Sequence, residues 1–355
     1  MPPLRVNLDA IARRVGVSRM SVSRAINGQK GISESTRLRI LKVCQEMNYS
    51  LLPQISAAMR YVRSPGDVSW RGSIGLINTF DPARIVCGVH GTYGRIIEGA
   101  KAEAFRLGYG LEIFHAQEPW QQGRRLTQKL LDCGVRGIIL GPHPTPKARL
   151  ELDWSHFTTI AIGYSLPEPE HHRIMSDLVG GIVQVCDGLR ALGYRRIALV
   201  IPEGYDQRTC HLFTSGYLGW QRRCQPGSDP LLHLWADFPA GERSLRYWLR
   251  RTRPDALVSY FPPMTLFERW GLHIPEEVGM AHLDLESTGG DFSGLYQNQG
   301  SMGAIAVHRL TAQLAAADFG IPREPTITLV RGHWVAGATT RALLPVAGEK
   351  GRRSK

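Results

Sequence analysis

The first fifty residues place apolar side chains at the spacing of short helices. Apolar positions recur with helical spacing over residues 8–15, behind Asn7, which can cap a helix. Gly16 suits a tight turn, and Ser18 can cap a second helix over residues 19–26. The pattern therefore predicts two short helices joined by a glycine turn.

The second helix is predicted to bury one face and expose the other. Val22, Ala25 and Ile26 share a face at i, i+3 and i+4, so we expect them to pack inward. A third helix follows Ser33 and ends near Asn48. Helices in this order form a helix-turn-helix, whose second helix enters the major groove of DNA with its first residues at the base edges.

The outward face of the second helix carries side chains that suit DNA. Arg19 can make paired hydrogen bonds to guanine, and Met20 can contact a thymine methyl group. Short polar side chains on this face suit phosphate oxygens. The position of Arg24 suits two roles equally well, a contact with DNA and an ion pair within the three-helix head. The candidate DNA-contacting residues are Ser18, Arg19, Met20, Ser21, Ser23, Arg24 and Asn27.

Beyond residue 70 the pattern changes to short apolar runs separated by amphipathic helices. Strands separated by helices predict parallel sheets with right-handed crossovers. The expected strands are 74–77, 111–114, 137–140, 159–162, 197–201 and 256–259. The expected helices are 91–107, 121–133, 177–192 and 241–252.

The charge of the chain is concentrated at its ends. The formal net charge is +12, and residues 1–63 hold eleven basic and three acidic residues. Residues 349–355 hold four basic and one acidic residue, which leaves residues 64–348 close to neutral. A basic head on a neutral body indicates a module that binds a polyanion, carried by a second domain.

Several classes of protein are disfavoured by what the sequence lacks. The six cysteines form no CxxC pair, so we expect reduced thiols, no metal site and no disulfide framework. No phosphate-binding loop, nucleophile elbow or HExxH motif occurs, so we expect neither an enzyme nor a cofactor. The start has no apolar signal core and no apolar run could span a bilayer, so we expect a cytoplasmic, nucleoid-associated protein without a membrane partner.

Four short segments of the head fit the pattern of one family. They read Asn7-Leu-Asp-Ala-Ile-Ala12, Gly16-Val-Ser-Arg-Met-Ser-Val-Ser-Arg-Ala-Ile-Asn27, Ile32-Ser-Glu-Ser-Thr-Arg37 and Met47-Asn-Tyr49. In this order and spacing they resemble the DNA-binding domain of LacI/GalR-family repressors. The body carries similar landmarks, among them Arg253-Pro-Asp-Ala-Leu257 and the run from Gly271 to Val278.

The resemblance implies a fold and a mode of action. The fold would be an all-α helix-turn-helix N-terminal domain followed by an α/β, two-lobed effector domain like a periplasmic binding protein, with a parallel sheet in each lobe. A homodimer of such chains binds a palindromic operator in double-stranded DNA. A small molecule would bind between the lobes, at the carboxyl ends of their strands.

The connector between head and body departs from the family pattern. Family members carry a Pro-Asn step soon after the tyrosine, and a hinge helix whose leucines enter the minor groove. Here Pro53-Gln54 stands two residues late, but Ile55, Ala58 and Met59 keep helical spacing. Met59 and Ile55 are the candidate minor-groove wedges. Packing of these residues against the body or a partner chain fits the pattern equally well.

The positions that contact ligand in the family also depart from its pattern. Phe213 stands where relatives often carry arginine, and Tyr260-Phe261 replaces an Asn-Asp step. Asp284 aligns with the family's Gly-Phe-Asp aspartate and is the first candidate ligand contact, with a loop or helix cap as its alternative role. Trp220 and Asp81 are further candidates, and Tyr260 and Phe213 complete the set.

These observations define the expected domains. They are a helix-turn-helix domain at 1–50, a hinge and linker at 51–70, an effector and dimerisation domain at 71–344 and a basic tail at 345–355. The first lobe is expected at about 71–174 and 287–324, and the second at about 175–286 and 325–344. We expect a sequence-specific repressor controlled by a sugar or related metabolite. The alternative is a DNA-binding regulator or architectural protein that has lost small-molecule control.

Overall fold

A computed structural model describes the chain at 8–26, 33–46, 71–80, 91–116, 123–146, 148–236, 240–260 and 264–343. The chain divides into two compact units, Met1–Asp67 and Val68–Lys355. Each unit is considered by itself. The expected hinge residues Ile55 and Met59, and the basic tail, lie outside the described residues.

The described part of the first unit is helical. Its elements are α1 (Leu8–Val15), α2 (Arg19–Ile26) and α3 (Glu34–Glu46). Gly16 has a φ of +75°, which places the turn between α1 and α2 in the left-handed region that glycine tolerates. A small apolar core joins the helices: Ile11, Ala12, Val15, Val22, Ala25 and Ile40.

Side-chain hydrogen bonds fix where these helices begin. The Ser18 hydroxyl accepts the amide proton of Ser21 at 3.0 Å, as an N-cap does. Ser33 caps α3 in the same way by accepting the amide proton of Thr36 at 3.3 Å. The inward face predicted from Val22 and Ala25 is buried. The helix-turn-helix expectation is therefore confirmed at the level of local structure.

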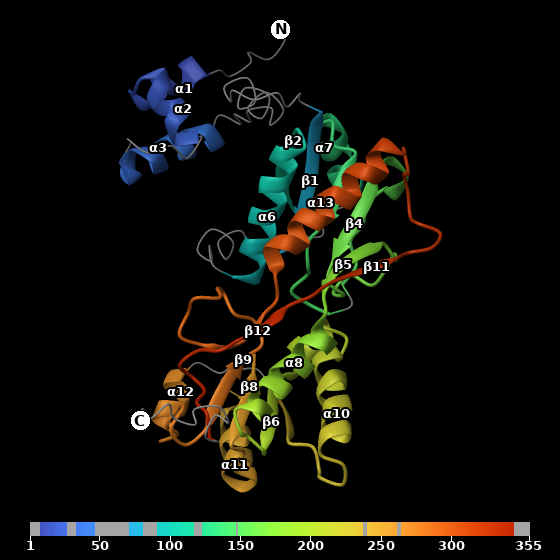
Figure 1. Cartoon of the computed structure of the whole chain (residues 1–355). Coiled ribbons are helices and arrows are strands. Elements are labelled where there is room, and N and C mark those ends of the chain that lie inside the picture. The colour runs from blue at the N-terminus through green and yellow to red at the C-terminus, as the bar shows by residue number, and fades with distance from the viewer. Residues whose placement is uncertain are drawn as a thin grey trace, which may run out of the picture. The chain divides into compact units, whose positions relative to one another are not determined.

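The second unit contains two six-stranded sheets, each the centre of one lobe (Figure 1). Lobe 1 has the strand order β11-β5-β4-β3-β1-β2, all parallel. Its strands are β1 (Gly72–Asn78), β2 (Tyr109–His115), β3 (Gly137–Leu140), β4 (Thr158–Ile162), β5 (His172–Ser176) and β11 (Ile327–Val330). Its helices are α6 (Thr92–Arg106), α7 (Gly123–Asp132), α13 (Gln299–Ala315) and the short η2 (Trp154–His156).

Lobe 2 repeats this plan with the strand order β12-β10-β9-β8-β6-β7. Only β12 among these strands runs antiparallel, to β10, so the expectation of parallel sheets fails at this edge. The strands are β6 (Ile197–Pro202), β7 (Leu232–Trp235), β8 (Ala256–Ser259), β9 (Gly279–His282), β10 (Ser293–Tyr296) and β12 (His333–Val335). The helices are α8 (Leu178–Ala191), α9 (Glu203–Arg208), α10 (Leu212–Cys224), α11 (Glu242–Thr252) and α12 (Met264–Arg269).

Helices cover both faces of each sheet, because the strands are apolar on both sides. In lobe 1, α6 and α13 pack on one face and α7 on the other. In lobe 2, α8 and α10 pack on one face, and α11 and α12 on the other. Each lobe is therefore a three-layer α/β/α body.

The lobe boundaries differ from those expected. β10 pairs with β9, so it belongs to lobe 2, although 287–324 was expected in lobe 1. β11 pairs with β5, so it belongs to lobe 1, although 325–344 was expected in lobe 2. A strand belongs to the lobe whose strands it pairs with by hydrogen bonds. The sequence of a short strand next to a connection between the lobes does not reveal which strands it pairs with. The chain passes between lobes after β5, after β10 and after β11.

Candidate functional sites

The outward face of α2 presents two large side chains to solvent. The Arg19 side chain is 68% exposed, and Met20 is 63% exposed. Arg19 lies 3.8 Å from the Asp9 carboxylate, an exposed ion pair that costs little to break. Arg24 is also exposed, and Ser21 and Ser23 are partly exposed. The residues expected to contact DNA thus share an accessible surface, except Asn27, which lies outside the described residues.

Ser18 has a local structural role in addition to its predicted DNA contact. Its hydroxyl oxygen lies 2.9 Å from the Ser21 hydroxyl as well as accepting the Ser21 amide proton. These bonds hold the first turn of α2, from which Arg19 and Met20 project.

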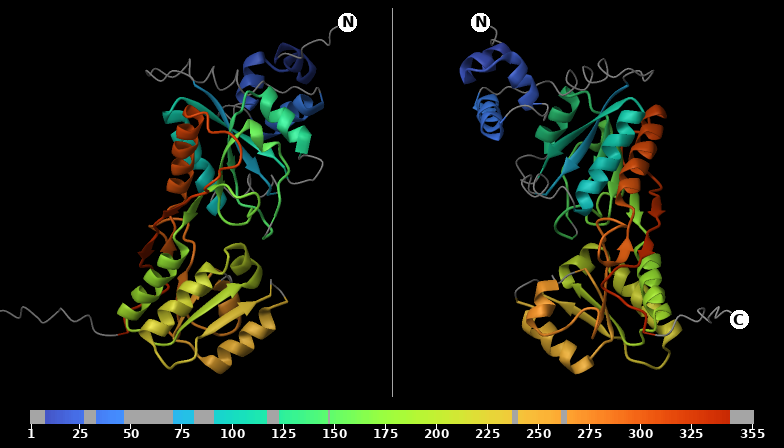
Figure 2. Two further views of the ribbon diagram at one scale, coloured as in Figure 1. Left: turned by 90° about the vertical axis from the view of Figure 1, so that its right-hand side faces the viewer. Right: turned by 60° about the vertical axis from the view of Figure 1, so that its left-hand side comes forward.

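Two helices of lobe 1, α6 and α13, pack closely against each other and end at the boundary with lobe 2. α6 and α13 lie side by side, as both views of Figure 2 show. A Cβ on Gly99 would overlap the carbonyl oxygen of Gly300, and a Cβ on Gly303 would overlap that of Ile96. Glycine at 99 and 303 therefore lets the backbones touch, and the N-terminal ends of both helices point toward lobe 2.

Asp284 of lobe 2 binds these two helix ends. Its carboxylate accepts hydrogen bonds from the Thr92 hydroxyl and from the Gln299 side-chain amide, and Thr92 and Gln299 are the first residues of α6 and α13. Arg95 Nη2 lies 3.1 Å from Asp284 Oδ1, and Arg95 Nε donates to Gln299 Oε1 at 3.2 Å. We call Thr92, Arg95, Asp284 and Gln299 the interlobe clamp.

The clamp is enclosed. The Asp284 side chain is 5% exposed and the Arg95 side chain 12%. Burial raises the pKa of Asp284, while Thr92, Arg95, His282 and Gln299 oppose that rise by stabilising the carboxylate. The positive ends of α6 and α13 add attraction for the negative charge. The clamp ties the lobes together by a carboxylate that is almost completely buried.

Beside the clamp, a cavity of about 290 Å³ lies between the lobes. It sits at the carboxyl ends of β1, β3, β4, β6 and β8, where the fold class predicts a ligand. Lobe 1 contributes Phe80, Gly91, Thr92, Tyr93, Ile96, Pro142, Ile162, Gly163, Tyr164, Ser165, Met175, Ser176 and Met302. Lobe 2 and its connections contribute Leu178, Tyr205, Arg208, Thr209, Tyr260 and Gln297.

A tyrosine pair forms the lobe 2 wall of this cavity. The rings of Tyr205 and Tyr260 stack with centroids 3.6 Å apart and planes at 18°. Arg208 lies over the Tyr205 ring, 5.0 Å from its centroid. Burial raises the pKa of Tyr205 and of Tyr260, so both rings carry neutral hydroxyls at physiological pH.

The predicted ligand-contact residues separate into two groups. Tyr260 lines the cavity, and Asp284 lies beside it in the clamp. Phe213 and Trp220 are 0% and 1% exposed in the core of lobe 2, and neither lines the cavity. The Trp220 indole donates to Asp187 at 2.7 Å, which satisfies its polar group there. Asp81 lies outside the described residues.

Sequence reasoning missed most of the residues that build this boundary. Arg95, Thr92 and Gln299 carry no motif, and Tyr205 and Arg208 lie on a helix that was not expected. The first three lie at or near the N-terminal ends of α6 and α13, and a helix N-terminus attracts a carboxylate.

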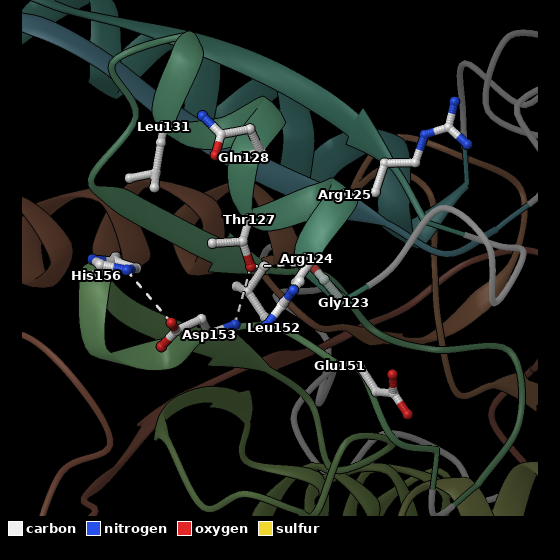
Figure 3. A pocket seen from close by; sticks show the side chains of 10 residues that line it. All are labelled: Gly123, Arg124, Arg125, Thr127, Gln128, Leu131, Glu151, Leu152, Asp153 and His156. Carbon is white, nitrogen blue, oxygen red and sulfur yellow. Dashed lines mark hydrogen bonds and ion pairs between the residues drawn. The ribbon is translucent and has the colours of Figure 1, made fainter.

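A second, wider hollow of about 850 Å³ lies on lobe 1 beside α7 and is open to solvent. Figure 3 shows Arg125 projecting away from the other lining side chains, which are Gly123, Arg124, Thr127, Gln128, Leu131, Glu151, Leu152, Asp153 and His156. His156 Nε2 lies 3.4 Å from the Asp153 carboxylate. The Thr127 hydroxyl donates to the Gly123 carbonyl and accepts the amide proton of Asp153. This hollow is more open to solvent and belongs to one lobe, so the cavity between the lobes is the better candidate site.

Two features are absent from the described residues. No group of His, Cys, Asp or Glu there is arranged to hold a metal ion. In the same part of the chain, no helix has the length and apolar character needed to cross a membrane.

The fold and the two sites are those of a class of regulatory protein with a helix-turn-helix head and a two-lobed α/β body. Residues 7–51 match the family model described as bacterial regulatory proteins, lacI family. The HTH-type transcriptional repressor CytR of Escherichia coli is 25% identical over 288 residues, 78% of this chain and 80% of CytR. The regulator PtxS of Pseudomonas putida is 26% identical over 213 residues, 59% of this chain, which spans 57% of PtxS.

Solved structures agree with this fold. A complex of the transcriptional regulator CelR with cellobiose superposes with a TM-score of 0.60 at 19% identity, covering 94% of this chain and 100% of that one. The lac repressor dimer bound to operator and the anti-inducer ONPF has a TM-score of 0.56 at 19% identity, with coverage of 95% and 99%. Residues 7–51 are thus similar in sequence to lacI-family regulators, and the chain shares the fold of the lac repressor.

Proposed function

We propose that this protein is a homodimeric transcriptional repressor that binds a palindromic operator through α2 and responds to a small molecule between its lobes. The observation that carries the DNA-binding part is the exposed pair Arg19 and Met20 at the start of a capped helix. The family match over residues 7–51 and the operator complex of the lac repressor support it.

The roles of the α2 side chains follow from their positions. Arg19 reads a guanine, Met20 contacts a thymine methyl group, and Ser18, Ser21 and Ser23 approach phosphates together with Asn27. Arg24, exposed one turn further along the helix, adds a phosphate contact. The basic head, with eleven basic residues against three acidic ones in residues 1–63, makes binding fall steeply with salt.

The test is selection of bound DNA from a random library, followed by binding measurements on the selected site. Arg19→Ala should weaken binding by about 1–3 kcal/mol and relax one base position in each half-site. Arg13→Ala is the control, because Arg13 is an exposed arginine of α1 outside the predicted reading face. If Arg19→Ala bound every DNA sequence as tightly as the unaltered protein does, the proposal would be contradicted.

The effector part rests on the cavity and the clamp. Both link the lobes, so a molecule that binds the cavity and prefers one degree of closure shifts the equilibrium between open and closed forms. Coupling of this kind acts in both directions, so operator DNA changes ligand affinity by the same factor. The structural neighbour CelR was solved in complex with cellobiose, which supports a small-molecule ligand for this fold.

A second candidate function is a DNA-binding regulator without small-molecule control. The clamp favours it, because Asp284, the aspartate expected to contact ligand, is occupied by Thr92, Arg95 and Gln299. A thermal-shift screen over sugars, nucleosides and organic acids separates the two candidates. A compound that raises the melting temperature and changes operator affinity excludes the second candidate.

A further inference from the structure

The cavity between the lobes has a wall that is mostly aromatic and apolar. Phe80, Tyr93, Tyr164, Tyr205 and Tyr260 contribute rings, and the other large side chains are aliphatic or methionine apart from Arg208 and Gln297. At about 290 Å³ it lies at the small end of ligand cavities, roughly 300–1,000 Å³. A single ring with a short substituent fits that size.

The serine and threonine side chains of this wall, and Gln297, already make hydrogen bonds within the protein. Thr92 donates to Asp284, and Gln297 donates to the carbonyl of Leu283 at 2.7 Å. The other bonds are Ser165 with the amide of His143, Ser176 with Met302, and Thr209 with the carbonyls of Tyr205 and Asp206. A sugar needs several free polar groups to pair its neighbouring hydroxyls, so this wall fits a sugar poorly.

One charged side chain lines the cavity among the described residues. Arg208 lies against the Tyr205 ring, and no described carboxylate lies within ion-pair distance of it. Its guanidinium can bind a carboxylate with two parallel hydrogen bonds, and the low-dielectric wall strengthens that pairing. Asp284 does not occupy Arg208, because the Asp284 carboxylate is held by Arg95 in the clamp.

Tyr93 adds an independent sign of a missing partner. Its ring lines the cavity, and its hydroxyl is buried without a hydrogen-bond partner among the described residues. Burial raises the pKa of Tyr93, so the hydroxyl stays protonated and able to donate. A ligand oxygen that reached it would satisfy this buried group.

We propose that the effector is a small aromatic carboxylate, with its ring against the Tyr205–Tyr260 pair and its carboxylate on Arg208. This inference rests on the proposed function, because it names the chemical class of effector for the same cavity. The proposal replaces the sugar expected from the sequence with a ligand whose charge and ring match the lining.

The test uses the full chain with four kinds of probe. Benzoate and phenylacetate represent the proposed class, and benzamide is their neutral counterpart. Ribose and cellobiose represent sugars, and cytidine represents nucleosides. Melting temperature and calorimetric titration give binding, and operator affinity is measured with and without each probe that binds.

We expect benzoate or phenylacetate to raise the melting temperature and to bind at least tenfold more tightly than benzamide. Arg208→Gln should remove that tenfold preference and leave benzamide unchanged. Arg222→Gln is the matched control, because Arg222 is an exposed arginine of α10 that does not line the cavity. It should bind the carboxylate as the unaltered protein does.

The outcomes separate this inference from the proposed function. Binding of sugars or cytidine without binding of the carboxylates overturns the aromatic class and leaves effector control standing. Carboxylate binding that survives Arg208→Gln overturns the role of Arg208. No binding of any probe overturns the inference and supports the regulator without small-molecule control. Carboxylate binding with unchanged operator affinity supports the ligand class and contradicts effector control.

Discussion

Asp284 and Asp206 are two buried carboxylates of the same unit whose partners come from different places. The Asp284 side chain is 5% exposed and that of Asp206 0%. Asp284 of lobe 2 takes its partners from lobe 1, namely Thr92, Arg95 and Gln299. Asp206 of α9 takes its partners from its own lobe.

The partners of Asp206 lie at the start of α10. His211 Nδ1 lies 2.7 Å from Asp206 Oδ2, and the Thr214 hydroxyl donates to Oδ1 at 2.8 Å. The His211 amide also donates to the Asp206 carbonyl at 2.8 Å. These bonds fix α9, the helix that presents Tyr205 and Arg208 to the cavity.

The origin of the partners distinguishes two structural roles of a buried carboxylate. A carboxylate bound across a boundary favours one arrangement of two bodies, so losing it changes how the bodies are positioned. A carboxylate bound within one body holds the wall of a site in place, so losing it loosens that wall. The experiments below test this separation, each with a measurement of stability and a measurement of lobe closure.

The largest expected effect comes from Arg95→Ala. Removing Arg95 leaves the Asp284 carboxylate buried and without its countercharge, which typically costs about 3–5 kcal/mol. Urea unfolding at pH 8 should show that loss, and small-angle scattering should show a more open second unit. The loss should shrink at lower pH, because without Arg95 the pKa of Asp284 rises further and the neutral acid tolerates burial.

Arg106→Ala is the control on the same helix. Arg106 pairs with Glu103 at 2.6 Å, but its side chain is 61% exposed. Solvent screens an exposed guanidinium, so Arg106→Ala should lose clearly less unfolding free energy than Arg95→Ala. If both variants lost the same free energy, the clamp would not differ from an ordinary surface ion pair.

Much of the fold could be predicted from the sequence, because its signals are local. The apolar run 137–140 became β3 with the same bounds, and the caps at Ser18, Ser33 and Asp177 mark helix starts. The clamp could not be predicted this way. Its residues come from three segments, with Arg95 and Gln299 204 positions apart, and the Gly99–Gly303 crossing of α6 and α13 brings the helix ends together.

The family pattern pointed to Asp284 but not to its partners. A motif gives the residue type at a position, whereas the partner of a buried charge depends on packing between elements. Phe213 and Trp220 illustrate the same limit, since a large aromatic residue fits a ligand site and a core equally well in the sequence.

A smaller effect is expected from Thr214→Val, which removes one donor to Asp206 and keeps the shape of the side chain. Leaving a buried carboxylate oxygen without this donor should cost about 1–3 kcal/mol in unfolding free energy. Lobe closure measured by scattering should not change, whereas binding of a cavity ligand should weaken. A change in closure equal to that of Arg95→Ala would erase the distinction between the two carboxylates.

The smallest effect is the pH dependence that Asp284 itself contributes. Burial raises its pKa in the folded protein above the ordinary value of 3.8, so the folded chain holds this proton to higher pH than the unfolded chain. The contribution to stability is therefore fully present below that ordinary value and is lost as pH rises through the raised pKa. Arg95 and His282 face the carboxylate and limit the size of this loss.

Asp284→Asn cannot titrate, so subtracting its unfolding free energy from that of the unaltered protein isolates this term. The difference should fall as pH rises from about 4 and become constant once the carboxylate is ionised. A difference that instead rises with pH would mean that Arg95, Thr92 and Gln299 outweigh burial and lower the pKa of Asp284. Asp284 would then belong with carboxylates whose charge stabilises the fold at neutral pH, and closure of the lobes would strengthen with pH.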